Sequence, residues 1–183
     1  MNLPNKLTLL RVLLVPVFIV LTYLPFPGHM YAALAVFILA SLTDFLDGYL
    51  ARKLNLITDF GKFMDSLADK ILVLAALIWL VEADIMPGWC LFVVMAREFA
   101  VSGLRMVAAN TGRVIAAGWS GKVKTASTMV CICLIMLLFE VSFLPANLLQ
   151  GVETACVVVI LVTTIYSGIE YFVKNKDVFK GQM

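Results

Sequence analysis

The sequence predicts an all-α integral membrane protein, with one domain over residues 1–183 built as a bundle of six transmembrane helices. Hydrophobic residues make up 62% of the chain and charged residues only 14%, whereas soluble domains average about 45–50% and about 25%. No Asp, Glu, Lys or Arg occurs from Val12 to Thr43, a window of 32 residues. One helix spans a bilayer with about 20 residues. This window therefore predicts two consecutive helices that cross the membrane in opposite directions.

Each expected span is built on an apolar stretch. The first two are separated by Pro25, Pro27 and Gly28, residue types that end helices and form turns. The later apolar stretches are shorter than a full span, so charged helix ends must complete them. The apolar stretches of the last four spans cover 71–81, 85–96, 125–139 and 154–169. The six expected spans cover residues 8–24, 30–52, 61–81, 86–109, 121–141 and 147–172.

Basic residues are confined to one side of this bundle. They occur near the start of the first span, between spans 2 and 3, between spans 4 and 5, and after span 6. The opposite turns, around 25–29, 82–87 and 142–147, contain no Lys or Arg. Cytoplasmic loops carry the excess of these residues. We therefore expect a multi-pass protein of the inner or plasma membrane, with both termini and the segment between spans 2 and 3 on the cytoplasmic side.

Five aspartates lie in one stretch, DFLDGYLARKLNLITDFGKFMDSLAD. On helices, Asp44 and Asp47 share a face, and Asp65 and Asp69 share another. A short connection makes the two helices antiparallel neighbours, so these four carboxylates are expected to converge. Asp59 falls outside the pattern and is expected in the loop or at a helix cap. Oxygen-rich clusters suit Mg²⁺ or Mn²⁺, and a pair of such ions is a known device for phosphoryl transfer.

Small residues accompany the aspartates. Gly48, Ala51 and Gly61 fall on the same helix faces and would let a ligand approach the backbone closely. The planar guanidinium of Arg52 suits a diphosphate. The alternative is that the small residues only ease helix packing, with charges that mark the membrane boundary.

The complete pattern, D-x₂-D-G-x₂-A-R-x₈-G-x₃-D-x₃-D, resembles the signature of the CDP-alcohol phosphatidyltransferase family. The resemblance implies a CDP-linked lipid donor, a two-metal site built by the four aspartates, release of CMP, and a homodimer. The opening PNKLTLLR resembles the family's N-terminal segment, whose polar residues approach the nucleotide diphosphate. The residues expected to bind CDP-diacylglycerol are Asn5, Thr8, Gly48, Ala51, Arg52 and Gly61.

Basic residues in the second half of the chain predict an anionic acceptor. REFAVSGLR (97–105) and GKVKT (121–125) resemble the family members that make phosphatidylglycerophosphate. The expected acceptor is sn-glycerol 3-phosphate, with inositol phosphate or phosphatidylglycerol as alternatives. Glu98 is placed to orient Arg105 or to neutralise Arg97. The residues expected to bind the acceptor are Arg97, Arg105, Arg113, Lys122, Lys124 and Thr125. Membrane orientation or attraction to anionic lipid is the alternative role for these charges.

In the reaction that the resemblance implies, a hydroxyl of glycerol 3-phosphate attacks the phosphorus attached to diacylglycerol, and CMP leaves. Asp69 is expected to be both a metal ligand and the general base. A membrane prenyltransferase would carry a second aspartate-rich motif, which this sequence lacks. An ion-coupled transporter would place its acids near the middle of the bilayer, on broken helices. Neither remote alternative fits acids gathered at the cytoplasmic ends of two spans.

Overall fold

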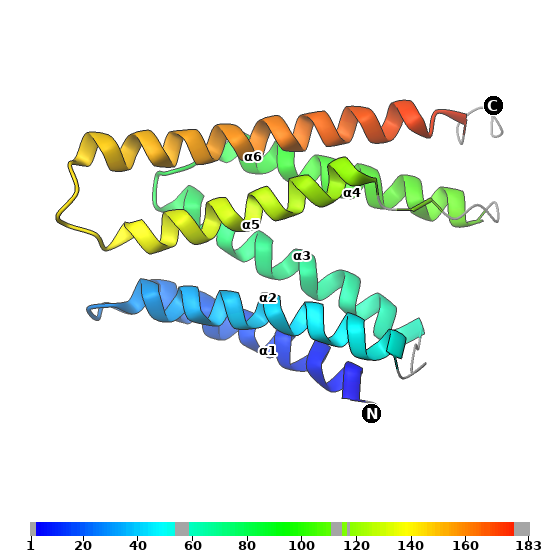
Figure 1. The fold of residues 1–183 in the computed structure, drawn as a ribbon, viewed down its shortest axis with the longest axis horizontal. Coiled ribbons are helices and arrows are strands. Elements are labelled where there is room, and N and C mark those ends of the chain that lie inside the picture. The colour runs from blue at the N-terminus through cyan, green and yellow to red at the C-terminus, as the bar shows by residue number, and fades with distance from the viewer. Residues whose placement is uncertain (1–2, 54–58, 111–114, 117, 178–183) are drawn as a thin grey trace. The chain divides into compact units, whose positions relative to one another are not determined.

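The computed structural model describes residues 3–53, 59–110, 115–116 and 118–177 of this protein, without the side chains of 3–8, 44–53, 59–67, 69 and 110. The described residues form six α-helices and no strand (Figure 1). The all-α class predicted from the sequence is therefore confirmed for this part of the chain. The helices are α1 (Leu3–Tyr23), α2 (His29–Lys53), α3 (Asp59–Glu82), α4 (Gly88–Asn110), α5 (Trp119–Phe139) and α6 (Ala146–Lys174).

Some helices extend beyond the expected spans, while α4 begins at Gly88 rather than at 86 and α5 ends at Phe139 rather than at 141. Helix α1 begins at Leu3 rather than at residue 8. Pro4 does not prevent this, because proline is tolerated in the first turn of a helix, where its missing N–H has no helical partner. Helix α5 begins at Trp119 rather than at 121, and α6 runs on to Lys174 rather than to 172. Hydropathy alone underestimates such ends because it does not register a polar helical turn.

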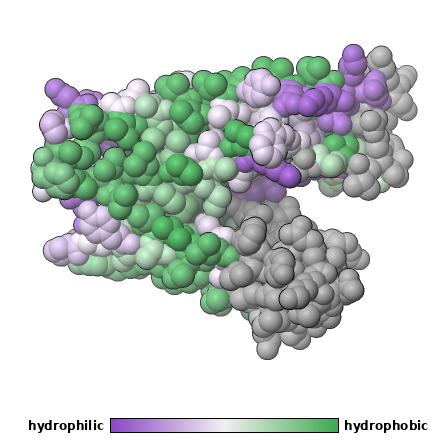
Figure 2. Space-filling view, viewed as in Figure 1, coloured by the Kyte–Doolittle hydropathy of each residue, from purple (hydrophilic) through white to green (hydrophobic). Residues whose placement is uncertain are grey.

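Two of the described helices, α5 and α6, are long and apolar enough to cross a membrane. Shorter apolar helical segments cover Leu9–Tyr23 and His29–Thr43. Figure 2 shows hydrophobic side chains over much of the described surface on one face. Large apolar side chains are also exposed along α6 at Val158, Val162, Ile165, Ile169 and Val173. Such an extended apolar surface is typical of contact with lipid rather than with water.

Helices α1, α2 and α3 form one compact unit together with residues 133–144. Helices α1 and α2 are joined by the fully buried rings of Phe18 and Phe37, whose centroids lie 5.8 Å apart. Trp79 of α3 packs edge-on against Phe139 at the end of α5, with 5.1 Å between ring centroids. These aromatic contacts are part of the apolar packing of the unit, together with buried aliphatic residues such as Leu77 and Leu80.

The start of α2 is capped from a distant part of the same unit. Glu140 accepts hydrogen bonds from the backbone N–H groups of Gly28 and Met30, each at 2.7 Å. Gly28 has a φ of +82°, a conformation that glycine adopts without strain. His29 lies with Nε2 3.7 Å from Glu140 and Nδ1 3.2 Å from the carbonyl oxygen of Leu21. A carboxylate at a helix N-terminus is favourable because unpaired N–H groups and the helix dipole meet it there.

The second compact unit holds α4, residues 119–132 of α5, and α6. Its described core includes Val101, Leu104 and Ala108 of α4, which cluster with Tyr171 of α6. This packing fixes the rotation of α4 and α6 about their axes. It therefore decides which polar residues of the two helices meet.

Candidate functional site

The four aspartates predicted to bind metal lie in two consecutive helices of the first unit. Asp44 and Asp47 belong to the last part of α2, and Asp65 and Asp69 to the first turns of α3. The helical backbone that the face argument requires is therefore present on both sides of the connection. Their side chains lie outside the description, so their convergence stays a prediction. Asp59, which was expected in the loop or at a helix cap, is the first residue of α3.

The donors available to the predicted metal site are oxygen atoms. His29 is engaged at the other end of α2, by Leu21 and Glu140. All four cysteines are free and belong to α4, α5 and α6, and three of them are buried. Among the side chains that the structure describes, no three His, Cys, Asp or Glu residues gather as metal ligands. A set of four carboxylates without nitrogen or sulfur suits Mg²⁺ or Mn²⁺ better than zinc.

The residues predicted to bind CDP-diacylglycerol also lie on helices of the first unit. Asn5 and Thr8 fall within α1, since this helix begins at Leu3, and their spacing of three places them on one helix face. Gly48, Ala51 and Arg52 lie in α2, and Gly61 lies in α3. Their side chains are not among those described, so this part of the site stays a prediction.

The structure describes a basic cluster in the second unit, formed by Arg97 and Glu98 of α4 and Lys124 of α5. One carboxylate oxygen of Glu98 accepts from Nη1 of Arg97 at 2.9 Å and from Nζ of Lys124 at 2.8 Å. The side chains are 12%, 23% and 5% exposed for Arg97, Glu98 and Lys124, respectively. Two cations and one anion leave a net positive charge, and partial burial weakens its screening by water and salt. An anionic group is the ligand that such a cluster favours.

Arg105 is held separately, by α6. Its Nε donates a hydrogen bond to the hydroxyl of Tyr171 at 2.9 Å, and its guanidinium carbon lies 5.5 Å from the centroid of the same ring. The sequence suggested that Glu98 either orients Arg105 or neutralises Arg97. The structure confirms the second alternative, since the bonds of Glu98 go to Arg97 and Lys124.

The other predicted acceptor residues are not part of this cluster. Lys122 is exposed while Lys124 is buried, as expected for residues 200° apart on a helix. The hydroxyl of Thr125 is exposed and donates to the carbonyl oxygen of Gly121 at 3.1 Å. Arg113 falls outside the described residues. The structure thus brings Arg97 and Lys124 together and leaves the binding roles of all six residues as predictions.

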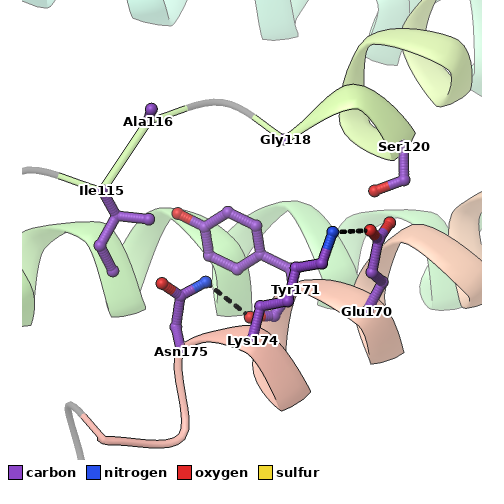
Figure 3. Close-up of a pocket in the computed structure, with 8 residues that line it drawn as sticks. All are labelled: Ile115, Ala116, Gly118, Ser120, Glu170, Tyr171, Lys174 and Asn175. Carbon is purple, nitrogen blue, oxygen red and sulfur yellow. Dashed lines mark hydrogen bonds and ion pairs between the residues drawn. The ribbon is translucent and has the colours of Figure 1, made fainter.

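A pocket of about 260 Å³ lies beside Tyr171, between the segment that precedes α5 and the end of α6 (Figure 3). Polar groups from both sides reach it. Glu170 and Lys174 form an ion pair on its wall, and the side-chain amide of Asn175 donates to the carbonyl oxygen of Tyr171 at 2.7 Å. The lining residues are Ile115, Ala116, Gly118, Ser120, Glu170, Tyr171, Lys174 and Asn175.

Sequence reasoning missed two contributions of α6 to these groups. Tyr171 is the partner of Arg105, and Gly168 lies against the side chain of Arg97. A weak signal was present, because Ser167, Gly168 and Tyr171 put small and polar groups on one face at the last turns of an apolar helix.

Comparison with known proteins shows the family of this chain. Residues 1–167 match the family model described as CDP-alcohol phosphatidyltransferase. The chain is 46% identical to a CDP-diacylglycerol–glycerol-3-phosphate 3-phosphatidyltransferase of Bacillus subtilis, over 98% of this chain and 97% of that protein. Proteins of the same name from Pseudomonas fluorescens and Escherichia coli are 43% and 36% identical, over 74% and 93% of this chain and 72% and 92% of theirs.

Proposed function

This chain belongs to the CDP-alcohol phosphatidyltransferase family, and on that basis we propose that it transfers the phosphatidyl group of CDP-diacylglycerol to sn-glycerol 3-phosphate. The products are phosphatidylglycerophosphate and CMP, in phospholipid biosynthesis. The names of the relatives support this acceptor. The observation that carries the proposal is the partly buried basic cluster of Arg97, Glu98 and Lys124, whose net positive charge suits a phosphate-bearing acceptor.

The acceptor site combines the basic residues of α4 and α5. Arg97 offers a planar guanidinium and Lys124 a compact ammonium group, two complementary ways to bind a phosphate. Arg105, whose orientation is fixed by Tyr171, extends this site. Arg113, Lys122 and Thr125 complete the proposed set. Choline, ethanolamine and serine carry no phosphate and fit this charge less well.

The donor site lies in the first unit. Arg52 holds the diphosphate of CDP-diacylglycerol, and Asn5 and Thr8 approach the nucleotide side of it. The small residues Gly48, Ala51 and Gly61 leave room for the ligand against the helix backbone. The acyl chains stay in the surrounding lipid, so the donor enters laterally.

Asp44, Asp47, Asp65 and Asp69 would hold two Mg²⁺ or Mn²⁺ ions. Bound there, the ions would neutralise charge that develops on the diphosphate. Asp69 also takes the proton of the attacking hydroxyl. A bond forms between that hydroxyl oxygen and the phosphorus attached to diacylglycerol, and the bond from this phosphorus to the oxygen of CMP breaks. The protein itself mainly positions the two substrates.

The proposed setting is a membrane crossed by all six helices, with both termini and the active site on the cytoplasmic side. The one-sided distribution of Lys and Arg supports this orientation. The apolar helices α5 and α6 support membrane insertion. A homodimer, as the family resemblance implies, completes the proposal, and the mass of the protein in detergent tests it.

Release of CMP from labelled CDP-diacylglycerol in liposomes tests the function. We expect release with glycerol 3-phosphate and Mg²⁺ or Mn²⁺, and its loss when a chelator removes the metal. Release with inositol phosphate or phosphatidylglycerol alone would assign a different acceptor within the family. No release with any acceptor would overturn the proposed transfer.

A further inference from the structure

The side chain of Arg97 crosses from α4 to α6 at Gly168. A Cβ atom placed on Gly168 would lie 3.2 Å from Cγ of Arg97, closer than ordinary van der Waals contact. Gly168 is buried and lies within the last two turns of α6. The stem of Arg97 therefore occupies space that any other residue at this position would fill.

The far end of Arg97 lies beside a second glycine. A Cβ atom on Gly121, in the first turn of α5, would lie 3.6 Å from Nη2 of Arg97, an ordinary contact. On the other side of the guanidinium, Nη1 donates to Glu98 at 2.9 Å. Three helices thus define the position of one arginine.

The remaining guanidinium nitrogen does not help to fix this position. Nε of Arg97 is buried and has no hydrogen-bond partner among the described residues. The bond to Glu98 holds the guanidinium end of the side chain and does not by itself fix the position of the stem. Packing against Gly168 is consequently what sets how deeply the arginine lies between the helices.

We propose that Gly168 is a positioning residue, whose missing side chain sets the depth of Arg97 and thereby aims its guanidinium at the phosphate of the acceptor. The acceptor part of this inference rests on the proposed function. The contact is at Cγ, near the base of the side chain, so a small displacement there is amplified at the guanidinium. Catalytic sites tolerate such misplacement poorly.

The test is Gly168→Ala, with Gly151→Ala as its matched control. Both glycines lie in α6, but a Cβ atom on Gly151 would meet nothing within 4 Å. We expect Gly168→Ala to raise the KM for glycerol 3-phosphate about tenfold or more, with the KM for CDP-diacylglycerol changed less than about twofold. Gly151→Ala should change neither value. Equal behaviour of the two variants would overturn the proposal.

A double-mutant cycle separates positioning from a general structural defect. In an Arg97→Ala background the crowded stem is gone, so adding Gly168→Ala should cause no further rise in the KM for glycerol 3-phosphate. An additional rise in that background would contradict action through Arg97.

Thermal unfolding in detergent gives a readout that needs no activity. Gly168→Ala should lower the midpoint, or prevent folding, whereas Arg97→Ala/Gly168→Ala should recover it to the level of Arg97→Ala or above. A double variant that stays as unstable as Gly168→Ala would show that the loss of stability does not come from crowding against Arg97, and would overturn the proposal. If the wild-type protein releases no CMP with glycerol 3-phosphate, the proposed function fails, while this cycle still decides whether Gly168 sets the depth of Arg97.

Discussion

Glu98 binds two cations from different helices through one carboxylate oxygen. Such an arrangement stabilises the two cations and cancels only one of their two positive charges. It also fixes two donors that are otherwise long and mobile, so that a ligand need not pay the full cost of ordering them. Glu98 therefore orders the two cations that we propose to contact the phosphate of the acceptor.

Lys124→Ala should raise the KM for glycerol 3-phosphate about tenfold or more, because a charge-assisted hydrogen bond to the phosphate is lost. The KM for CDP-diacylglycerol should change far less. Steady-state kinetics with each substrate varied in turn measure the difference. Lys176→Ala, which removes an exposed lysine after α6, is the control. Equal increases for both substrates would count against an acceptor role.

Tyr171→Phe isolates the hydroxyl that orients Arg105. The ring stays, so the contact with the guanidinium at 5.5 Å is retained while the hydrogen bond at 2.9 Å is lost. Loss of one such bond costs about 0.5–1.5 kcal/mol, and we expect the KM for glycerol 3-phosphate to rise about threefold to tenfold. Tyr166→Phe, at an exposed position of the same helix, is the matched control. An unchanged KM in Tyr171→Phe would separate Arg105 from the acceptor.

Asp69→Asn should lower kcat by at least about a hundredfold, since a general base contributes roughly that much or more. The amide is nearly the same size as the carboxylate, so we expect the protein to fold and to retain part of its affinity for CDP-diacylglycerol. Single-turnover CMP release and a binding assay measure the two effects. An active Asp69→Asn enzyme is incompatible with the proposed base.

At the scale of helices, the sequence predicted correctly which helices exist and in what order they follow one another. All six predicted helices occur in the described part of the chain, because uncharged runs and turn residues such as Pro25 and Gly28 mark them clearly. The sequence placed Arg97 and Lys124 in one site, and the structure brings them together through Glu98. The partner of Arg105 was not predicted. Arg105 and Tyr171 are separated by 66 positions, and their meeting depends on helix rotations set by packing of residues such as Leu104 and Ala108. Spacing within one helix carries no information about those rotations.

The cap of α2 gives a prediction at the same scale. The two oxygens of Glu140 accept from different backbone N–H groups, of Gly28 and Met30. Glu140→Gln keeps one acceptor oxygen and loses the charge, so we expect the free energy of unfolding to fall by about 1–2 kcal/mol. Denaturant titration in detergent measures this loss. Glu153→Gln, at a partly exposed glutamate of α6, should be nearly neutral, and equal losses would exclude a special role for the cap.

For the molecule as a whole, the distribution of apolar and charged side chains is the reverse of that in a soluble protein. Apolar side chains such as Val162 and Ile169 are exposed, whereas Arg97 and Lys124 are largely covered. Lipid accepts the former, and the covered charges require a partner or a ligand. The sequence predicted this division from composition and from the positions of Lys and Arg. It also offered Glu98 as the acid that neutralises Arg97, which the ion pair at 2.9 Å confirms, but it did not predict that Glu98 binds Lys124 as well.

The proposed topology predicts which ends of α6 are accessible from each side of the membrane. Its 29 residues span about 43 Å, more than the apolar core of about 30 Å, so both ends should reach water. A cysteine introduced by Phe143→Cys, before the helix, should react with an impermeant maleimide on intact cells. One introduced by Lys176→Cys should react only after permeabilisation, because the positive-inside rule places it in the cytoplasm. Both positions are exposed, and three of the four native cysteines are buried, which keeps the background low. Labelling of both sites from the same side would contradict a membrane-spanning α6, and the reverse pattern would invert the proposed orientation.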